Sequence, residues 1–163
     1  MDELLKWNNL KQVLEEYAIE VRNRYQDNLI QFNHIATGDL LNNIDYLIET
    51  NGNEISVSLR LEEYWKYVEW DTKPHFPPVD KIREWIKVKP IIPDGRSGRL
   101  PTENQLAYLI GRKISEVGTT GTNDLHRAID EVNAEYEEKI GIAIEQDLSD
   151  SLMIIFSEFL REN

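Results

Sequence analysis

The sequence predicts an α+β fold: an N-terminal helix, an antiparallel β-hairpin or small sheet packed by helices, and a long C-terminal helical segment. Apolar residues recur every three or four positions over residues 10–29, alternate in two short runs over 44–61, and resume the helical spacing from 125 onward. With 163 residues, 40% of them hydrophobic, the chain is large enough for one core of ordinary size. We therefore predict a single domain over residues 1–163.

The first helix is predicted by an apolar stripe of about five turns. Its residues are Leu10, Val13, Leu14, Tyr17, Ala18, Val21, Tyr25 and Leu29. Side chains three and four positions apart share one face of a helix, so we expect this face to be buried.

Two alternating runs of apolar residues predict the hairpin. The first holds Ile44, Tyr46 and Ile48, and the second holds Ile55, Val57, Leu59 and Leu61. Between them, Asn51 and Gly52 match the two-residue turn that commonly joins antiparallel strands. Because alternate residues of a strand point to the same side, the hairpin is expected to bury one face.

The middle of the chain predicts two short helices. Residues 62–70 form a helix or turn packed against the sheet, and Pro78 begins a second helix that ends at Lys89 and Pro90. The side chains expected to face inward are Tyr64, Tyr67 and Val68 in the first, and Val79, Ile82, Trp85 and Ile86 in the second.

A loop and a capped helix follow. Residues 93–99 contain turn-forming residues and two arginines but no apolar anchor, so we expect a mobile loop at about 93–100. Thr102 and Gln105 match a capping box, a motif that begins a helix. Residues 118–121 are predicted to be a flexible joint. The expected inner stripe is Leu106, Leu109, Ile110, Ile114 and Val117, with Gly118 as the stop.

The C-terminal helical segment, residues 124–162, has an apolar stripe along almost its whole length. Its residues are Leu125, Ile129, Val132, Tyr136, Ile140, Ile144, Leu148, Leu152, Ile155 and Phe159. Such a stripe is typical either of two helices, broken here near Gly141 or Asp147, or of one long helix packed on a neighbouring subunit. The sequence leaves both open.

Composition argues against several classes of protein. A net charge of -12 disfavours a protein whose main task is to neutralise DNA phosphates. The absence of cysteine excludes disulfides and thiol chemistry, and it suits a protein made in a reducing cytoplasm. The longest apolar run, 152–156, is far below the roughly 20 residues of a membrane-spanning helix. We therefore expect a soluble protein with no membrane partner.

The charge is unevenly distributed. Over 73–113 there are nine basic and four acidic residues, a balance of +5, whereas over 124–163 there are three basic and eleven acidic residues, a balance of -8. This polarity suits head-to-tail contact between copies of the chain. The alternative is that both segments are ordinary solvated faces.

No arrangement of residues predicts catalysis, a cofactor or a metal. His34, His75 and His126 are far apart in the sequence, and none has the spacing that places two metal ligands on one helical face. Gly118 and Gly121 lack the lysine and the preceding strand of a phosphate-binding loop. Adjacent carboxylates point to different faces of a helix, which is poor geometry for acid and base catalysis. We predict that the protein is not an enzyme.

Aromatic residues are concentrated just before a proline-rich loop. Those of residues 64–70 cover more than one face of any helix, so they cannot all enter one core. Trp65 or Trp70 is therefore expected to be exposed, as large aromatics often are at interfaces. The alternative for Trp70 is burial beneath the loop at 74–78.

Several motifs follow one another in a definite order. The first contains Thr37, Gly38, Leu40, Asn43 and Ile44; the second contains Tyr64, Tyr67, Val68, Glu69 and Thr72; the third contains Pro74, His75, Pro77, Pro78 and Trp85. A helix over 106–117 that ends at Gly118 would be the fourth. In this order they resemble the head-tail joining, or tail-completion (neck), proteins of tailed bacteriophages. The chain departs from that family at Asp71, where glycine is usual, and at Asn43, where serine is common.

The resemblance implies a structural virion protein of the neck, present in the host cytoplasm during assembly. It implies a connector ring of six or twelve copies that joins the DNA-filled head to the tail, with portal or adaptor and tail proteins as partners and incidental contact with packaged DNA. The expected interface residues are Trp65, Trp70, Thr72, His75, Phe76, Arg96 and Arg99. For His75 the alternative is a loop histidine held by its own turn.

A second hypothesis comes from another class of protein. An acidic cytoplasmic protein-binding module, or an inhibitor of a nucleic-acid-binding partner, would offer its carboxylates to a basic surface. It explains the net charge of -12 but not the order of the motifs or the basic segment over 73–113.

Overall fold

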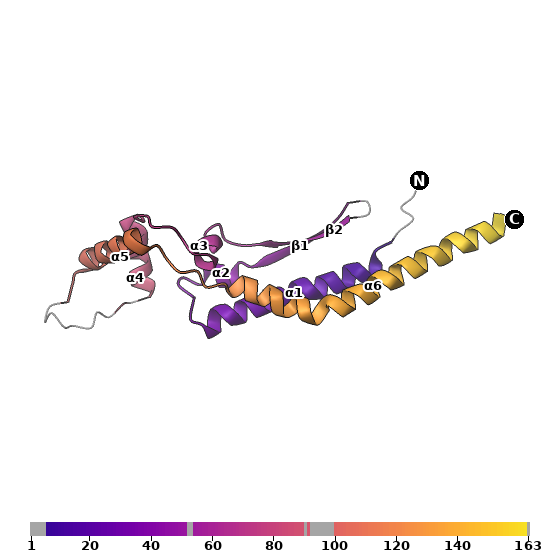
Figure 1. Cartoon of the computed structure of the whole chain (residues 1–163), viewed down its shortest axis with the longest axis horizontal. Coiled ribbons are helices and arrows are strands. Elements are labelled where there is room, and N and C mark those ends of the chain that lie inside the picture. Colours follow the sequence, from indigo (N-terminus) through magenta and orange to yellow (C-terminus); the bar gives the residue numbers. More distant parts are fainter. Residues whose placement is uncertain (1–5, 52–53, 90, 92–99, 163) are drawn as a thin grey trace. The chain divides into compact units, whose positions relative to one another are not determined.

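The computed structural model describes residues 6–51, 54–89, 91 and 100–162. It confirms the mixed fold that the sequence predicts, which contains helices and a two-stranded antiparallel sheet (Figure 1). The elements are α1 (Asn8–Gln31), α2 (Asp39–Asn42), β1 (Asp45–Asn51), β2 (Glu54–Arg60), α3 (Trp65–Glu69), α4 (Val79–Val88), α5 (Glu103–Val117) and α6 (Asp124–Glu162).

The chain forms two compact units. Unit 1 contains Met1–Asn28, Ile44–Leu61 and Leu125–Asn163, and unit 2 contains Leu29–Asn43 and Glu62–Asp124. Each unit therefore takes its residues from segments that are far apart in the sequence. The single domain over 1–163 stays a prediction.

Unit 1 is built on α1 and α6, which lie antiparallel. Contacts pair Asn9 with Asp147, Tyr17 with Tyr136, and Arg24 with Glu131, so the residue numbers fall along one helix as they rise along the other. The predicted apolar face of α1 is confirmed. The residues buried in unit 1 on these two helices include Leu10, Ala18, Val21, Tyr25, Leu125, Ala128, Val132, Tyr136 and Ala143.

Polar contacts lie along the edge of this helix pair. The rings of Tyr17 and Tyr136 meet edge to face at 5.8 Å and 78°, and the Tyr17 hydroxyl donates to Asn133 Oδ1 at 2.8 Å. Burial raises the pKa of the Tyr17 phenol. Arg24 donates hydrogen bonds to three glutamates, and these bonds raise the pKa of its guanidinium above the ordinary value. The glutamates are Glu20, Glu131 and Glu135, at 2.9, 3.1 and 3.0 Å.

The β-hairpin confirms the two alternating runs. Tyr46 lies opposite Leu59 and Ile48 opposite Val57, so the apolar side chains share one face of the sheet. Asn51 was predicted to be a turn residue, but it is the last paired residue of β1 and lies opposite Glu54. Pairing therefore extends one residue further than expected, and Gly52, the other predicted turn residue, lies outside the described residues.

The C-terminal segment is one continuous helix, α6. It is not divided into two helices near Gly141 or Asp147, which was one of the two predicted alternatives. Gly141 lies inside α6, and so does Asp147, whose carboxylate accepts hydrogen bonds from α1 and does not compete for its own backbone. After Ser151, every side chain described on α6 is exposed. Among the residues described, none of the helices is long and apolar enough to cross a membrane.

In unit 2, α4 and α5 pack against each other. Ile82, Ile86 and Ala107 are buried together. The capping box is confirmed, since Gln105 N–H donates to Thr102 Oγ1 at 3.3 Å and Thr102 N–H donates to Gln105 Oε1 at 3.0 Å. The helix then ends at Gly118, as predicted.

The predicted inner faces of α4 and α5 were partly wrong. Trp85, Leu109 and Val117 are exposed, whereas Ala107 and Gly111 are buried on α5. A Cβ at Gly111 would lie only 3.0 Å from Cζ of Phe76 and 3.3 Å from Cδ1 of Ile82. Small residues therefore face the core because they let neighbouring segments approach closely, and the larger residues are turned outward.

Candidate functional site

Two of the sequence motifs meet in unit 2. The backbone N–H of Leu40, in α2, donates to the hydroxyl of Tyr64 at 2.9 Å. Gly38 precedes α2 with φ +91°, a conformation that favours glycine, and the Thr37 hydroxyl accepts from Asp39 N–H at 3.3 Å. Tyr64 and Tyr67 were expected to face inward, but they are 39% and 60% exposed, and the Tyr64 hydroxyl bonds to α2.

A bridge between residues 68–72 and 119–123 holds the second motif. Thr72 N–H donates to Thr119 O at 2.9 Å, and Thr119 N–H donates to Thr72 Oγ1 at 3.0 Å. Asp71 Oδ1 also accepts from Gly121 N–H at 2.8 Å. The predicted flexible joint over 118–121 is wrong, since this segment is paired with a distant part of the chain. Thr72, expected at an interface, is half-buried and bonded within its own unit.

The two tryptophans of the second motif lie side by side. The ring centroids of Trp65 and Trp70 are 4.9 Å apart, at an interplanar angle of 59°. Trp70 is 53% exposed and Trp65 is half-buried. The expectation that one of the pair is exposed is confirmed. The half-buried ring of Trp65 packs against the exposed ring of Trp70.

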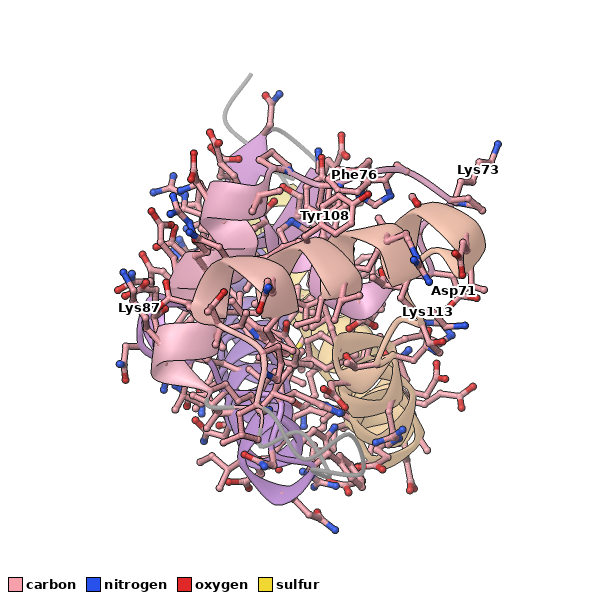
Figure 2. All side chains as sticks on the ribbon, turned by 90° about the vertical axis from the view of Figure 1, so that its left-hand side faces the viewer. Asp71, Lys73, Phe76, Lys87, Tyr108 and Lys113 are labelled. Carbon is pink, nitrogen blue, oxygen red and sulfur yellow. The ribbon has the colours of Figure 1, made fainter. Side chains whose placement is uncertain are left out.

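The proline-rich loop carries the other expected contact residues. Phe76 is 48% exposed, and its ring lies 6.0 Å from that of Tyr108 (Figure 2). His75 is exposed, and its Nδ1 lies 2.8 Å from the backbone oxygen of Lys73. The loop therefore holds His75 in its own turn and also presents it to solvent. Arg96 and Arg99 lie outside the described residues, as does the predicted mobile loop apart from Leu100.

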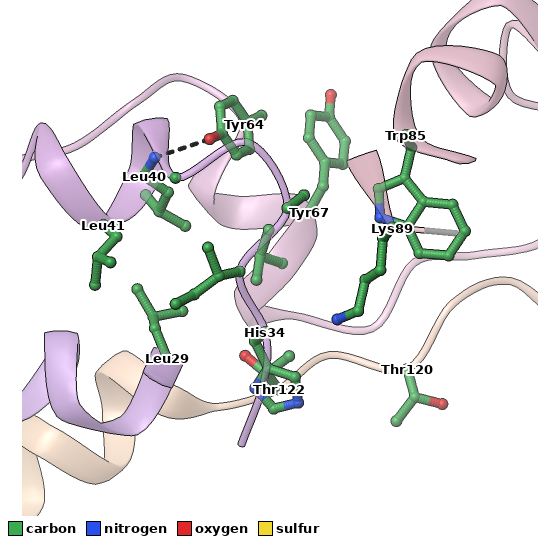
Figure 3. Close-up of a pocket in the computed structure, with 14 residues that line it drawn as sticks. Leu29, His34, Leu40, Leu41, Tyr64, Tyr67, Trp85, Lys89, Thr120 and Thr122 are labelled. Carbon is green, nitrogen blue, oxygen red and sulfur yellow. Dashed lines mark hydrogen bonds between the residues drawn. The ribbon is translucent and has the colours of Figure 1, made fainter. Parts of the chain in front are cut away.

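Unit 2 also contains a pocket of about 390 Å³ (Figure 3). Its size is near the lower end for small-molecule sites, which measure about 300–1,000 Å³. The lining is mostly apolar and aromatic, and none of the described residues in it is a carboxylate. The lining residues are Leu29, His34, Ile35, Ala36, Gly38, Leu40, Leu41, Tyr64, Tyr67, Val68, Trp85, Lys89, Thr120 and Thr122.

Two polar groups in the pocket wall are fixed by hydrogen bonds. His34 Nδ1 lies 2.6 Å from Oδ2 of Asp124, a fully buried residue at the start of α6. Lys89, the residue after α4, donates from its ammonium group to the backbone oxygen of Asn33. The pocket is thus an apolar cavity with a lysine in its wall, which suits an apolar group on an acidic partner.

In the part of the chain that the structure describes, no three histidine, cysteine or carboxylate side chains are grouped so that they could hold a metal ion. Comparison of the chain with protein-family models, curated proteins and solved structures finds no match. The surfaces of the protein must therefore be interpreted from their own chemistry.

Sequence reasoning missed the pocket. Trp85 was expected to face inward, Lys89 only to end a helix, and His34 was given no role. The residues that line the pocket come from separate stretches of the sequence that share no regular spacing, so only the fold brings them together. The sequence did indicate an apolar surface at the exposed end of α6, because the apolar stripe continues through Leu152 and Phe159.

Proposed function

We propose that the protein is a structural virion protein of a tailed bacteriophage, part of the neck or connector ring that joins the DNA-filled head to the tail. One observation carries the proposal: motif segments that resemble the tail-completion family contact one another in unit 2 and leave their aromatic side chains exposed. Tyr64 bonds the first motif through Leu40, and Trp70 and Phe76 project from the second and third.

Exposed aromatic side chains on hydrogen-bonded loops are well suited to assembly. Trp and Phe contribute much of the binding energy where they become buried at an interface. Trp70 is supported by Trp65, and Phe76 is supported by Tyr108, so little conformational freedom is lost when they bind. Within the proposal, Trp70, His75 and Phe76 contact neighbouring proteins, whereas Thr72 is bonded to Thr119 within unit 2.

The proposed partners are other copies of the chain, the portal or adaptor, and tail proteins. The uneven charge supports contact between copies, since a segment with a balance of +5 can face one with a balance of -8. The proposed place of action is the neck of the virion, after assembly in the host cytoplasm.

The test is electron microscopy of lysates from a phage with a stop codon in this gene. DNA-filled heads separate from finished tails are expected, with infectious particles restored when the gene is supplied in trans. Supplying a Trp70→Ser/Phe76→Ser variant should restore fewer particles than supplying Phe32→Ser, which changes an exposed aromatic outside the motifs. Normal particles without the gene would overturn the proposal and favour the acidic protein-binding module.

A further inference from the structure

The pocket in unit 2 is walled by aliphatic and aromatic side chains. Figure 3 shows Leu29 and Leu41 on one side of it and Trp85, from α4, on the other. Tyr67 and Trp85 are 60% and 39% exposed, so each ring has surface that a ligand could still cover. Removing such apolar surface from water favours binding. The pocket therefore suits an aromatic ring or a short hydrocarbon chain.

One positive charge lies in this apolar wall. Lys89 follows α4, and its ammonium group has three N–H donors, of which the described contacts use one, to the backbone oxygen of Asn33. None of the described lining residues is a carboxylate. Asp124 lies outside the lining and is bonded to His34. The charge of the lining therefore favours an anionic group on a ligand.

The same wall contains a buried hydroxyl. Thr122 Oγ1 is shielded from solvent and has no hydrogen-bond partner among the described residues. The backbone at this position is fixed, since Thr122 N–H donates to Val68 O at 2.9 Å. A buried hydroxyl that loses its bonds to water and gains none in return costs free energy, so such groups are rare in folded proteins. A ligand with an acceptor oxygen would supply the missing bond.

The size and polarity of the cavity limit the ligand. Its volume of about 390 Å³ is near the lower end of the range for small-molecule sites. A phenyl ring on a short hydrocarbon stem is suited to this space. A nucleotide or a sugar phosphate would bring many polar groups to a lining that offers few partners for them, and each unpaired group would weaken binding.

We propose that the unit 2 pocket binds a small apolar carboxylate. Its aromatic or aliphatic part lies between Trp85 and the leucines opposite, and its carboxylate accepts hydrogen bonds from the Lys89 ammonium group. The Thr122 hydroxyl is a second donor in the wall. The inference does not depend on the proposed virion role, because it uses only residues and contacts of unit 2.

Isothermal titration calorimetry of the full chain with phenylbutyrate and with octanoate tests the ligand class. The matched alcohols and amines serve as neutral and cationic analogues of nearly the same shape. Each acid should bind about tenfold more tightly than its alcohol, because a hydrogen bond to a charged group is stronger than one between neutral groups. The amines should bind more weakly than the alcohols. Binding should also have a negative heat-capacity change, which marks the burial of apolar surface.

Lys89→Met tests the charge, because it removes the ammonium group and keeps most of the stem. It should raise the Kd of both acids about tenfold and leave the Kd of the alcohols within about twofold of the original value. Lys87→Met is the matched control. It makes the same change two positions earlier on α4, at an exposed residue outside the pocket that pairs with Glu103 at 3.8 Å. This control should leave every Kd unchanged.

Thr122→Val tests the hydroxyl, because it keeps the shape of the side chain. Without ligand, the variant should be at least as stable to heat as the unchanged protein, since the described structure gives this hydroxyl no partner to lose. The Kd of the acids should rise by about threefold to tenfold. A less stable variant with an unchanged Kd would show that the hydroxyl has a structural role and would remove it from the site.

Circular dichroism checks that every variant is folded. If Lys89→Met is unfolded, Lys89→Gln replaces it with the same expected result. Ala36→Trp, at an exposed position in the pocket wall, should weaken the binding of acids and alcohols alike by filling the cavity. Acids that bind this variant normally would be bound elsewhere on the protein, which would contradict the assignment to the pocket.

Three further results would overturn the inference. They are no binding of either acid up to about 10 mM, a weaker affinity than specific ligands usually have, equal affinity for acids, alcohols and amines, and binding only by an acetylated peptide that ends in phenylalanine, which would assign the pocket to a protein partner. The stop-codon experiment tests the virion role alone. Normal particles together with binding of the acids would remove the proposed function and leave this inference standing, and separated heads and tails without binding would do the reverse.

Discussion

Asp147 caps the start of α1: its Oδ2 accepts a hydrogen bond at 2.9 Å from the backbone N–H of Leu10, 137 residues earlier in the chain. Its Oδ1 accepts from Asn9 N–H at 3.0 Å and from the Asn9 side chain at 2.8 Å. The first N–H groups of a helix have no partner within the helix, and a carboxylate there also interacts favourably with the helix dipole. The start of α1 is thus stabilised by α6 in place of a local cap.

Replacing Asp147 by alanine should lower the free energy of unfolding by about 1–3 kcal/mol, because it leaves N–H groups at the start of α1 without an acceptor. Urea denaturation monitored by circular dichroism measures the change. Asp147→Asn should cost less, since one acceptor oxygen remains. Asp150→Ala, at an exposed position on the same helix, should change stability by less than about 0.5 kcal/mol. Equal effects at 147 and 150 would contradict the capping role.

Thr72 should behave as a structural residue and not as a contact residue. Thr72→Val keeps the shape of the side chain but removes the acceptor of Thr119 N–H, so we expect a loss of about 1–2 kcal/mol in stability. Self-association of the folded variant should be unchanged. Thr120→Val is the matched control, because Thr120 is exposed and the bridge to Thr72 is made by its neighbour Thr119. A folded Thr72→Val protein with normal stability but weaker association would show instead that Thr72 is an interface residue.

Glycine substitutions should have opposite effects in the two parts of the chain. At Gly118, where φ is +75°, a Cβ would lie 1.9 Å from Thr72 O, and at Gly121 it would lie 2.3 Å from Glu69 O. Alanine at either position should destabilise the protein by about 1–3 kcal/mol or more. Alanine at Gly141 meets nothing within 4 Å and should stabilise α6 by about 0.5–1 kcal/mol. Thermal unfolding measures all three, and a stabilising Gly118→Ala would refute the bridge.

Much of the fold could be predicted because it follows local rules. The apolar face of α1, the alternation of the hairpin and the capping box at Thr102 each depend on residues a few positions apart. The inner face of α5 could not be predicted in this way. Hydrophobicity favours Leu109 for the core, but the close approach of Phe76 and Ile82 requires Gly111 there.

Prediction of the candidate sites had the same limit. Exposure of one of Trp65 and Trp70 followed from counting aromatic faces, which is local reasoning, but the sequence left burial of Trp70 open. The bridge from Thr72 to Thr119 and the contact of His34 with Asp124 join residues 47 and 90 positions apart, and no spacing in the sequence indicates them. The pocket is lined by residues from segments that are far apart in the sequence, so it could be found only in the folded chain.

The cluster around Arg24 should make stability depend on salt. Arg24 bonds Glu20 on its own helix and Glu131 and Glu135 on α6, and without it the two glutamates of α6 would repel each other at a spacing of four residues. Because the pairs are partly exposed, each should contribute no more than about 1 kcal/mol.

Arg24→Met should therefore lower the free energy of unfolding by about 1–2 kcal/mol at low ionic strength. At 1 M salt, where the screening length falls to about 3 Å, the difference between variant and unchanged protein should shrink. Arg112→Met is the control, since Arg112 pairs only with Glu116 in the described contacts, at 3.5 Å on an exposed helix face. Guanidinium is itself a salt, so urea denaturation at two sodium chloride concentrations is the measurement. A loss that stays constant with salt would assign the role of Arg24 to packing of its aliphatic stem, because screening weakens only the charge interactions.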